Sequence, residues 1–222
     1  MKDKESRSKK YYEKNKVKII KTVMFYKKKH KLNDNIDKIN ESLFFLMIPY
    51  DVIVTAKKIY ETSMQKKITI GNSSKNFTRC CFMIACYIHE FPILVNDLEF
   101  DRFSLYSNSI KKIKETVLPE LNLEIKKVSV EKYIERYCLQ LEYNKIHEKN
   151  IKFLFKKMSN KFQVILQWRN YLVAAAVIYI YAKNHMLSIT QERLCFITHT
   201  LPVTLRKTIK NVKNLYKREH NE

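Results

Sequence analysis

The sequence predicts an all-α fold, on the evidence of its glycine content and its apolar periodicity. The chain has 222 residues and a single glycine, Gly71. Tight hairpin turns favour glycine because it tolerates positive φ, so a β-rich fold is disfavoured. From Ile36 onward apolar residues recur at helical spacing. Hydrophobic residues make up 45% of the chain, enough for a packed core in one large domain or two smaller ones.

The first segment, residues 1–34, is predicted to be a basic arm. It is rich in Lys and Arg, and its few acidic residues include Asp3, Glu5 and Glu13. Such a composition favours a solvated, mobile segment. Two interpretations remain open: an arm for nuclear import or phosphate contact, and a basic tail without a dedicated role.

The segment 35–120 is predicted to form a first helical unit. Pro92 breaks its central apolar helix and Pro119 ends the unit, because proline disfavours helical geometry in the residue before it. The expected elements are helices near 36–46, 49–60, 77–89 and 104–118, with a short element at 94–100.

The segment 128–218 is predicted to form a second unit on the same plan. The expected helices cover about 129–141, 146–167, 168–184, 190–197 and 203–218. Each unit has a nearly all-apolar central helix, and each follows it with an acid just before a leucine, at Asp97 and at Glu192. This order indicates an internal repeat of about 80–90 residues, in which neighbouring helices surround each central helix.

The end of the second unit has the order of a DNA-reading helix-turn-helix, namely a buried helix, a short helix and a basic amphipathic helix. Leu205, Ile209, Val212 and Tyr216 form one apolar stripe on the last helix. We expect Arg206 to reach base edges and Val203 to contact a thymine methyl, while the lysines hold phosphates. The predicted DNA-binding residues are Val203, Thr204, Arg206, Lys207, Lys210 and Lys213.

The net charge of +21 favours polyanionic partners such as DNA, RNA or an anionic membrane surface. A codon bias toward Lys and Asn is the alternative source of this charge. The longest apolar run, residues 171–182, is shorter than the roughly 20 residues that cross a bilayer, so we expect a buried core helix and no membrane span. No secretory signal is visible, and five cysteines without a paired spacing favour a reducing compartment.

The sequence offers no catalytic constellation, cofactor motif or metal site. A single glycine cannot build a phosphate-binding loop, and the histidines lack metal-ligand spacing. Four glutamates are expected on exposed helix faces, paired with lysines rather than acting as acids: Glu131, Glu135, Glu142 and Glu148. We therefore expect a binding protein and not an enzyme.

Residues 37–218 resemble the core of the transcription factor IIB family, which consists of two tandem five-helix cyclin-like repeats. Three segments carry the resemblance. Cys81-Phe-Met-Ile-Ala-Cys-Tyr-Ile-His-Glu-Phe-Pro92 is similar to the third helix of the first repeat, Ala174 through Leu194 to the same part of the second, and Val203-Thr-Leu-Arg206 to the DNA-entering helix start.

The resemblance implies a general transcription initiation factor that binds double-stranded promoter DNA together with TATA-binding protein and helps to position RNA polymerase or its accessory factors. It also implies contacts with partners through five lysines: Lys57, Lys58, Lys66, Lys111 and Lys112. The paired cysteines of the family's N-terminal zinc ribbon have no counterpart in the basic arm, which puts polymerase recruitment by this chain alone in doubt.

Two other functions remain open at this point: a cyclin-like regulatory subunit of a protein kinase, and a helical protein that binds nucleic acid without sequence preference. The kinase alternative predicts an exposed apolar and acidic face on the first repeat. We expect a monomer or one part of a heteromeric complex. The expected location is intracellular, in the nucleus or, for a viral chain, in a cytoplasmic viral factory.

Overall fold

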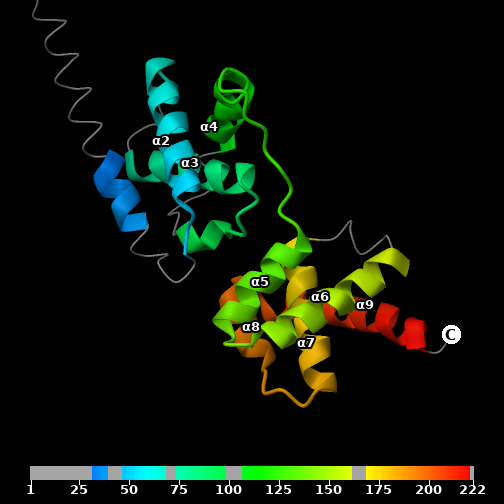
Figure 1. Ribbon diagram of the computed structural model, residues 1–222. Coiled ribbons are helices and arrows are strands. Elements are labelled where there is room, and N and C mark those ends of the chain that lie inside the picture. Colours follow the sequence, from blue (N-terminus) through cyan, green and yellow to red (C-terminus); the bar gives the residue numbers. More distant parts are fainter. Residues whose placement is uncertain (1–31, 40–46, 69–73, 99–106, 162–168, 221–222) are drawn as a thin grey trace, which may run out of the picture.

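The computed structural model describes residues 32–39, 47–68, 74–98, 107–161 and 169–220, and every regular element within these ranges is a helix. The predicted all-α class is therefore confirmed. The helices form two groups that lie side by side and are joined by an extended connection (Figure 1). The predicted basic arm falls outside the described residues except for its last three, which begin a helix over 32–39.

The first group is built around α3, whose side chains from Cys80 to Cys86 are all buried. Helix α3 packs against α2 and the 3-10 helix η2. Leu32 and Ile36 of the first helix complete this core together with Ile113. The elements after the first helix are α2 (Tyr50–Gln65), α3 (Ser74–Ile88), η2 (Val95–Leu98), α4 (Ser107–Lys112) and the π-helical η4 (Ile113–Val117).

The second group surrounds α7. This helix packs against α5, α6, α8 and α9, and its side chains from Leu172 to Ile178 are all buried. The elements are α5 (Val130–Gln140), α6 (Lys145–Lys161), α7 (Asn170–Asn184), α8 (Gln191–Thr198) and α9 (Pro202–His220). The longest apolar run is thus a core helix, as predicted, and no helix in the described ranges is long and apolar enough to cross a membrane.

Capping side chains fix the first turns of two helices, which begin close to the predicted residues. Ser129 Oγ accepts a hydrogen bond from the backbone N–H of Lys132 at 3.3 Å and begins α5. Thr190 Oγ1 accepts from the N–H of Arg193 at 3.1 Å and begins α8. Each hydroxyl satisfies one of the backbone donors that a helix start leaves unpaired.

Elsewhere the helix bounds differ from prediction. Helix α3 begins at Ser74, ahead of the predicted Phe77, and the helix expected to end near Leu118 changes to π geometry at Ile113. The part of the predicted helix 146–167 beyond Lys161 lies outside the described residues.

The segment that follows α3 forms the joint between the two groups. Arg136 of α5 donates a hydrogen bond to the carbonyl oxygen of Pro92 at 2.7 Å, and Tyr133 donates to that of Ile93 at 3.4 Å. Leu94 is buried in the core of the second group rather than in that of the first. The joint therefore combines apolar packing with polar contacts.

A buried ion pair lies at the centre of this joint. The guanidinium of Arg136 contacts both carboxylate oxygens of Asp97, at 2.7 and 2.8 Å. Both side chains are 2% exposed. The backbone N–H of Leu94 also donates to Asp97, at 2.6 Å. A buried charge is tolerated only when it is paired and hydrogen-bonded, and these bonds meet that requirement for Asp97.

Candidate nucleic-acid interface

Helices α8 and α9 are joined by a tight turn over residues 199–201, which gives the second group a helix-turn-helix. His199 adopts a left-handed conformation with φ of 48°. The N–H of Thr200 donates to the carbonyl of Cys195 at 3.1 Å, and that of His199 donates to Phe196 at 3.3 Å. This is the Schellman pattern, which ends one helix and redirects the chain into the next.

The inner face of α9 packs on α7. Leu205, Ile209 and Val212 are buried, and they belong to the same core as α7. Tyr216 is half-buried, and its hydroxyl accepts a hydrogen bond from Asn184 at 3.0 Å. The apolar stripe expected on the last helix is therefore present and fixes which side of α9 faces outward.

The outer face of α9 is basic. All six predicted DNA-binding residues are exposed: Val203, Thr204, Arg206, Lys207, Lys210 and Lys213. Arg206 Nε donates to the carbonyl of Pro202 at 3.3 Å, which places the guanidinium beside the first turn of the helix. Within the described ranges none of the four cations forms an ion pair with a carboxylate, so their charge faces solvent.

Apolar side chains flank the start of α9. Phe196, Leu201 and Val203 are 79%, 73% and 72% exposed. Only Val203 was singled out from the sequence. The exposure of Phe196 could have been predicted from its position on α8, because it lies off the face that carries the buried Leu194 and Ile197. Exposed apolar groups beside a row of cations suit a partner that combines negative charge with apolar edges.

The turn of the helix-turn-helix is tied to the joint between the groups. His199 Nε2 lies 3.0 Å from Asp97 Oδ1, the carboxylate that Arg136 holds. Burial alone would raise the pKa of Asp97, but the hydrogen bonds from His199 and Arg136 outweigh it and hold that pKa below its ordinary value. The orientation of α9 is thereby linked to the first group through Asp97.

Sequence reasoning did not find this link. Asp97 and Glu192 were interpreted as equivalent acids of two repeats, whereas Asp97 is buried and paired and Glu192 is exposed. The residue from which this link could have been predicted is Arg136, a cation on the face of α5 that also carries Tyr133 and Tyr137. A cation in an apolar stripe indicates a buried carboxylate partner.

The five lysines predicted to contact partners lie in the first group and are not brought together with α9 (Figure 1). Their positions are Lys57 and Lys58 on α2, Lys66 at its end, and Lys111 and Lys112 on α4. Lys66 is ion-paired with Glu120, and Lys111 lies 3.9 Å from Glu115. These two charges are thus partly neutralised within the protein itself.

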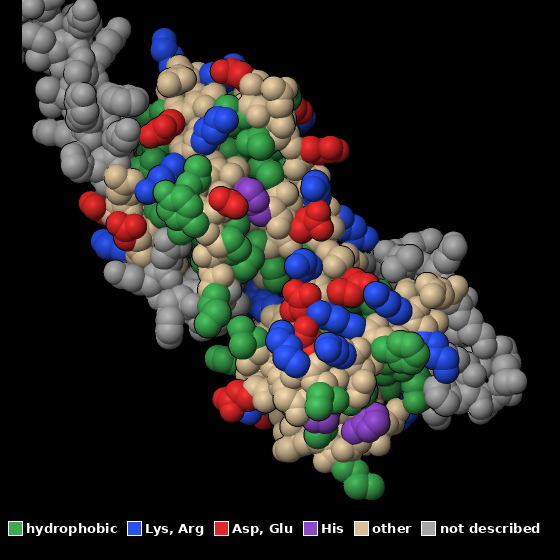
Figure 2. Space-filling view, viewed as in Figure 1, with side chains coloured by type: hydrophobic (Ala, Val, Ile, Leu, Met, Phe, Trp, Pro, Cys, Tyr) green, Lys and Arg blue, Asp and Glu red, His purple; other side chains and the backbone are tan. Residues whose placement is uncertain are grey.

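A network of alternating charges covers α5 and α6, where Figure 2 shows basic and acidic side chains interspersed. Lys152 contacts Glu135 at 2.8 Å and Glu148 at 2.7 Å. The predicted pairing of glutamates with lysines is therefore confirmed for these two. The exposure predicted for Glu148 is wrong, because it is only 7% exposed. The lysines it faces compensate for that burial.

The cysteines of this chain are poor nucleophiles. Burial raises the pKa of Cys80 and of Cys138 to about 12, and it raises that of Cys81 and Cys86 as well. Cys195 is half-buried, and its pKa is also raised. Since the thiolate is the reactive form, burial lowers the reactivity of these thiols. In the described ranges no group of His, Cys, Asp and Glu has the geometry to hold a metal ion.

No protein-family model matches the chain, and a search of the curated proteins finds no match.

Proposed function

We propose that this protein binds double-stranded DNA through α9, as a binding protein rather than an enzyme. One observation carries the proposal: α9 follows a helix-turn-helix turn, buries its apolar stripe on α7, and presents Arg206, Lys207 and Lys210 to solvent without ion-pair partners among the described residues. A helix presented in this way suits the major groove, where its N-terminal residues reach base edges.

Within that proposal the exposed residues have separate roles. Arg206, beside the first turn, donates to the edge of a base, and guanine accepts such a bidentate contact best. Val203 contacts a thymine methyl. Lys207, Lys210 and Lys213 bind phosphates and so set the position of the helix without reading sequence.

The more specific proposal is a general transcription initiation factor of the transcription factor IIB type. It would bind promoter DNA with TATA-binding protein and help to position RNA polymerase, using two cyclin-like repeats. Its support is the common order of elements: each group has two helices, then a buried central helix, a short helical element and a last helix. The first group would then contact the TATA-binding protein through lysines of α2 and α4.

A second candidate is a cyclin-like regulatory subunit of a protein kinase. Met47, Tyr50 and Val54 are 80%, 76% and 43% exposed at the start of α2, and Asp51 is exposed beside them. This small apolar and acidic patch on the first group is the feature that the kinase alternative predicts. Capture of an active kinase by the wild-type chain but not by Tyr50→Ala would favour this candidate.

The proposed DNA interface is tested by the salt dependence of binding. Each lysine that neutralises a phosphate contributes about 0.9 to the slope of log K against log salt concentration. We expect Lys207→Ala and Lys210→Ala each to weaken binding to a labelled duplex and to reduce that slope by about 0.9. Lys149→Ala, an exposed lysine of α6, is the matched control and leaves the slope unchanged. Equal slopes for all four proteins would refute the proposed role of α9.

A further inference from the structure

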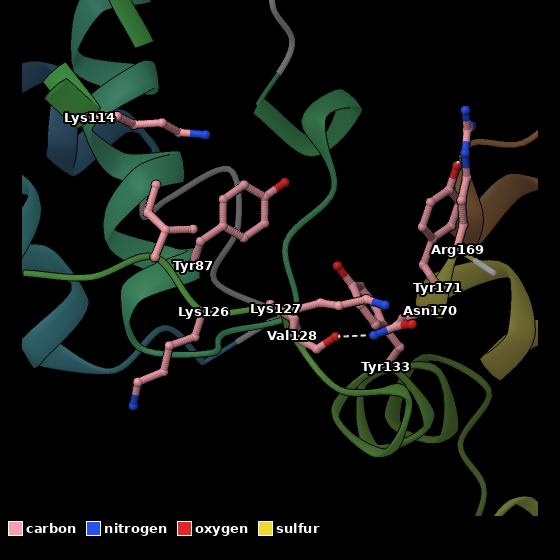
Figure 3. Close-up of a pocket in the computed structure, with 10 residues that line it drawn as sticks. Tyr87, Lys114, Lys126, Lys127, Val128, Tyr133, Arg169, Asn170 and Tyr171 are labelled. Carbon is pink, nitrogen blue, oxygen red and sulfur yellow. Dashed lines mark hydrogen bonds between the residues drawn. The ribbon is translucent and has the colours of Figure 1, made fainter. Parts of the chain in front are cut away.

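A cleft with a volume of about 570 Å³ lies between the two groups of helices, away from α9. Figure 3 shows side chains from both groups around it. Tyr87, at the end of α3, and Lys114 of η4 come from the first group, whereas Arg169 and Tyr171 come from the start of α7. This volume lies within the range typical of ligand sites.

The lining of the cleft is basic. Four cations contribute to it, namely Lys114, Lys126, Lys127 and Arg169, and no carboxylate lines it among the described residues. Lys126 lies 3.4 Å from Glu90 outside the cleft. Arg169 donates a hydrogen bond to the Tyr171 hydroxyl at 3.3 Å. In the ranges described, Lys114 and Arg169 have no carboxylate partner, so the cleft has an excess of positive charge that favours an anion.

The walls of the cleft are aromatic. Tyr87 and Tyr171 project from opposite sides (Figure 3). The rings of Tyr133 and Tyr171 are 6.2 Å apart between centroids, and the Tyr133 hydroxyl is held by the carbonyl of Ile93 at 3.4 Å. Burial raises the pKa of Tyr87 and of Tyr133, so both phenols stay uncharged and do not oppose the binding of an anion.

Two hydrogen bonds within the protein fix the connection that forms the base of the cleft. Asn170 Nδ2 donates to the carbonyl of Val128 at 2.6 Å, which ties the start of α7 to the connection between the groups (Figure 3). The N–H of Lys126 donates to the carbonyl of Tyr87 at 3.4 Å, so the same connection is also tied to α3. Cations and tyrosines from both groups are thereby kept around one space.

We propose that this cleft binds an unpaired nucleotide of a single-stranded nucleic acid, with the base against Tyr87 and Tyr171 and phosphates at Lys114 and Arg169. Cations that follow the backbone and aromatic faces that stack on bases are the combination by which proteins bind single strands. An acidic peptide would use the cations but not the aromatic faces. A duplex would offer phosphates, but its base faces are already stacked. The proposal does not depend on duplex binding by α9.

The test is fluorescence anisotropy of a labelled oligothymidine of about 12 nucleotides, within the site sizes known for single-strand binding, titrated with the full chain at low salt. Loss of one stacking contact weakens single-strand binding by roughly tenfold, so we expect that decrease for Tyr87→Ala. Tyr87→Phe keeps the ring and should bind like the wild type. Arg169→Ala should also weaken binding, whereas Lys149→Ala should not.

A labelled duplex, measured with the same variants, separates this site from α9. Tyr87→Ala should leave duplex binding unchanged, and Lys207→Ala should weaken it. The proposal is overturned if the oligothymidine does not bind, if Tyr87→Ala binds it as well as Tyr87→Phe does, or if polyglutamate displaces it as effectively as unlabelled oligothymidine. Thermal unfolding of each variant verifies that the fold is intact, and the Arg169→Ala result decides the question if Tyr87→Ala does not fold.

Discussion

At the scale of single residues, Asp97 links three parts of the described structure. Its carboxylate accepts hydrogen bonds from Arg136, from the backbone of Leu94 and from His199 in the turn before α9. Each partner comes from a different element, so one side chain connects the two groups and the helix-turn-helix. Asp97 therefore positions α9 without being part of its outer surface.

Replacing Asp97 with asparagine should destabilise the protein by about 3 kcal/mol, because it leaves the charge of Arg136 buried and unpaired. Urea unfolding at neutral pH measures the change. Glu115→Gln, which removes the exposed partner of Lys111, is the control and should change the free energy of unfolding by less than about 1 kcal/mol. Similar values for both variants would show that the buried pair contributes no more than a surface one.

The ionisation of Asp97 should make the stability of the protein depend on pH. The pKa of Asp97 is lowered in the folded protein from its ordinary value of 3.8, so the ionised form favours folding. This contribution is fully present above the ordinary value and is lost as the pH falls below 3.8. An asparagine in place of Asp97 removes it. Urea midpoints measured from about pH 6 to about pH 3 should therefore decrease less for Asp97→Asn than for the wild type. Parallel decreases would contradict the account.

Arg206 is predicted to read a base. Arg206→Ala should lower discrimination at one position of the DNA site by about 1–3 kcal/mol and reduce affinity for other sequences only modestly. Competition binding with duplexes that differ at single positions measures this. Lys210→Ala is the comparison, because a phosphate contact weakens binding to all sequences alike. An equal loss of affinity for all duplexes with Arg206→Ala would indicate that Arg206 also contacts a phosphate.

At this scale the sequence predicted surface residues better than buried polar ones. The exposure of Arg206 and its neighbours followed from the apolar stripe of Leu205, Ile209 and Val212, because one face of a helix determines the other. The pairing of Asp97 with Arg136 depends on how two distant segments meet, and helical periodicity carries no information on that contact.

At the scale of elements, five of the described helices end at left-handed residues that are not glycine. Lys67, Glu90, Glu142, Met186 and His199 all have φ between 48° and 58° and follow a helix directly or by one turn residue. The N–H of the residue after each donates to a carbonyl in the last turn of the helix, as that of Leu187 does to Ala182 at 2.8 Å. Glycine is the usual residue in this position because a Cβ is disfavoured there.

Met186→Gly should therefore stabilise the protein by up to about 1 kcal/mol. Its side chain is 96% exposed, so the substitution removes no packing, and the gain comes from the relief of left-handed strain. Met186→Ala keeps a Cβ at the same φ and is the matched control. Thermal unfolding of the three proteins compares them, and a glycine variant no more stable than the alanine variant would show that this turn is not strained.

Three helices of the second group, α5, α8 and α9, were predicted closely because each has a clear boundary signal. Ser129 and Thr190 cap their helices, and Pro202 occupies the first turn of α9, where its missing N–H is not needed. The π geometry at Ile113–Val117 had no such signal. Helix η4 packs against α2, a contact between distant segments that local sequence patterns do not encode.

At the scale of the whole molecule, basic side chains lie on two separate surfaces. Basic residues of α9 face solvent in the second group, and Lys114 and Arg169 face the cleft between the groups. On the face shown in Figure 2, basic and acidic side chains are mixed rather than gathered into one field. The net charge of +21 therefore does not locate a polyanion-binding surface, and particular surfaces have to be identified from the structure.

The proposal of a promoter-binding initiation factor is tested most directly by fluorescence anisotropy of a labelled duplex that contains a TATA element. The full chain is titrated at about 0.15 M salt, where the Debye length is about 8 Å, with and without TATA-binding protein. A duplex with a scrambled element is the control. The account predicts binding that is cooperative with TATA-binding protein and depends on the TATA element. Equal, weak binding to both duplexes, unchanged by TATA-binding protein, would contradict it.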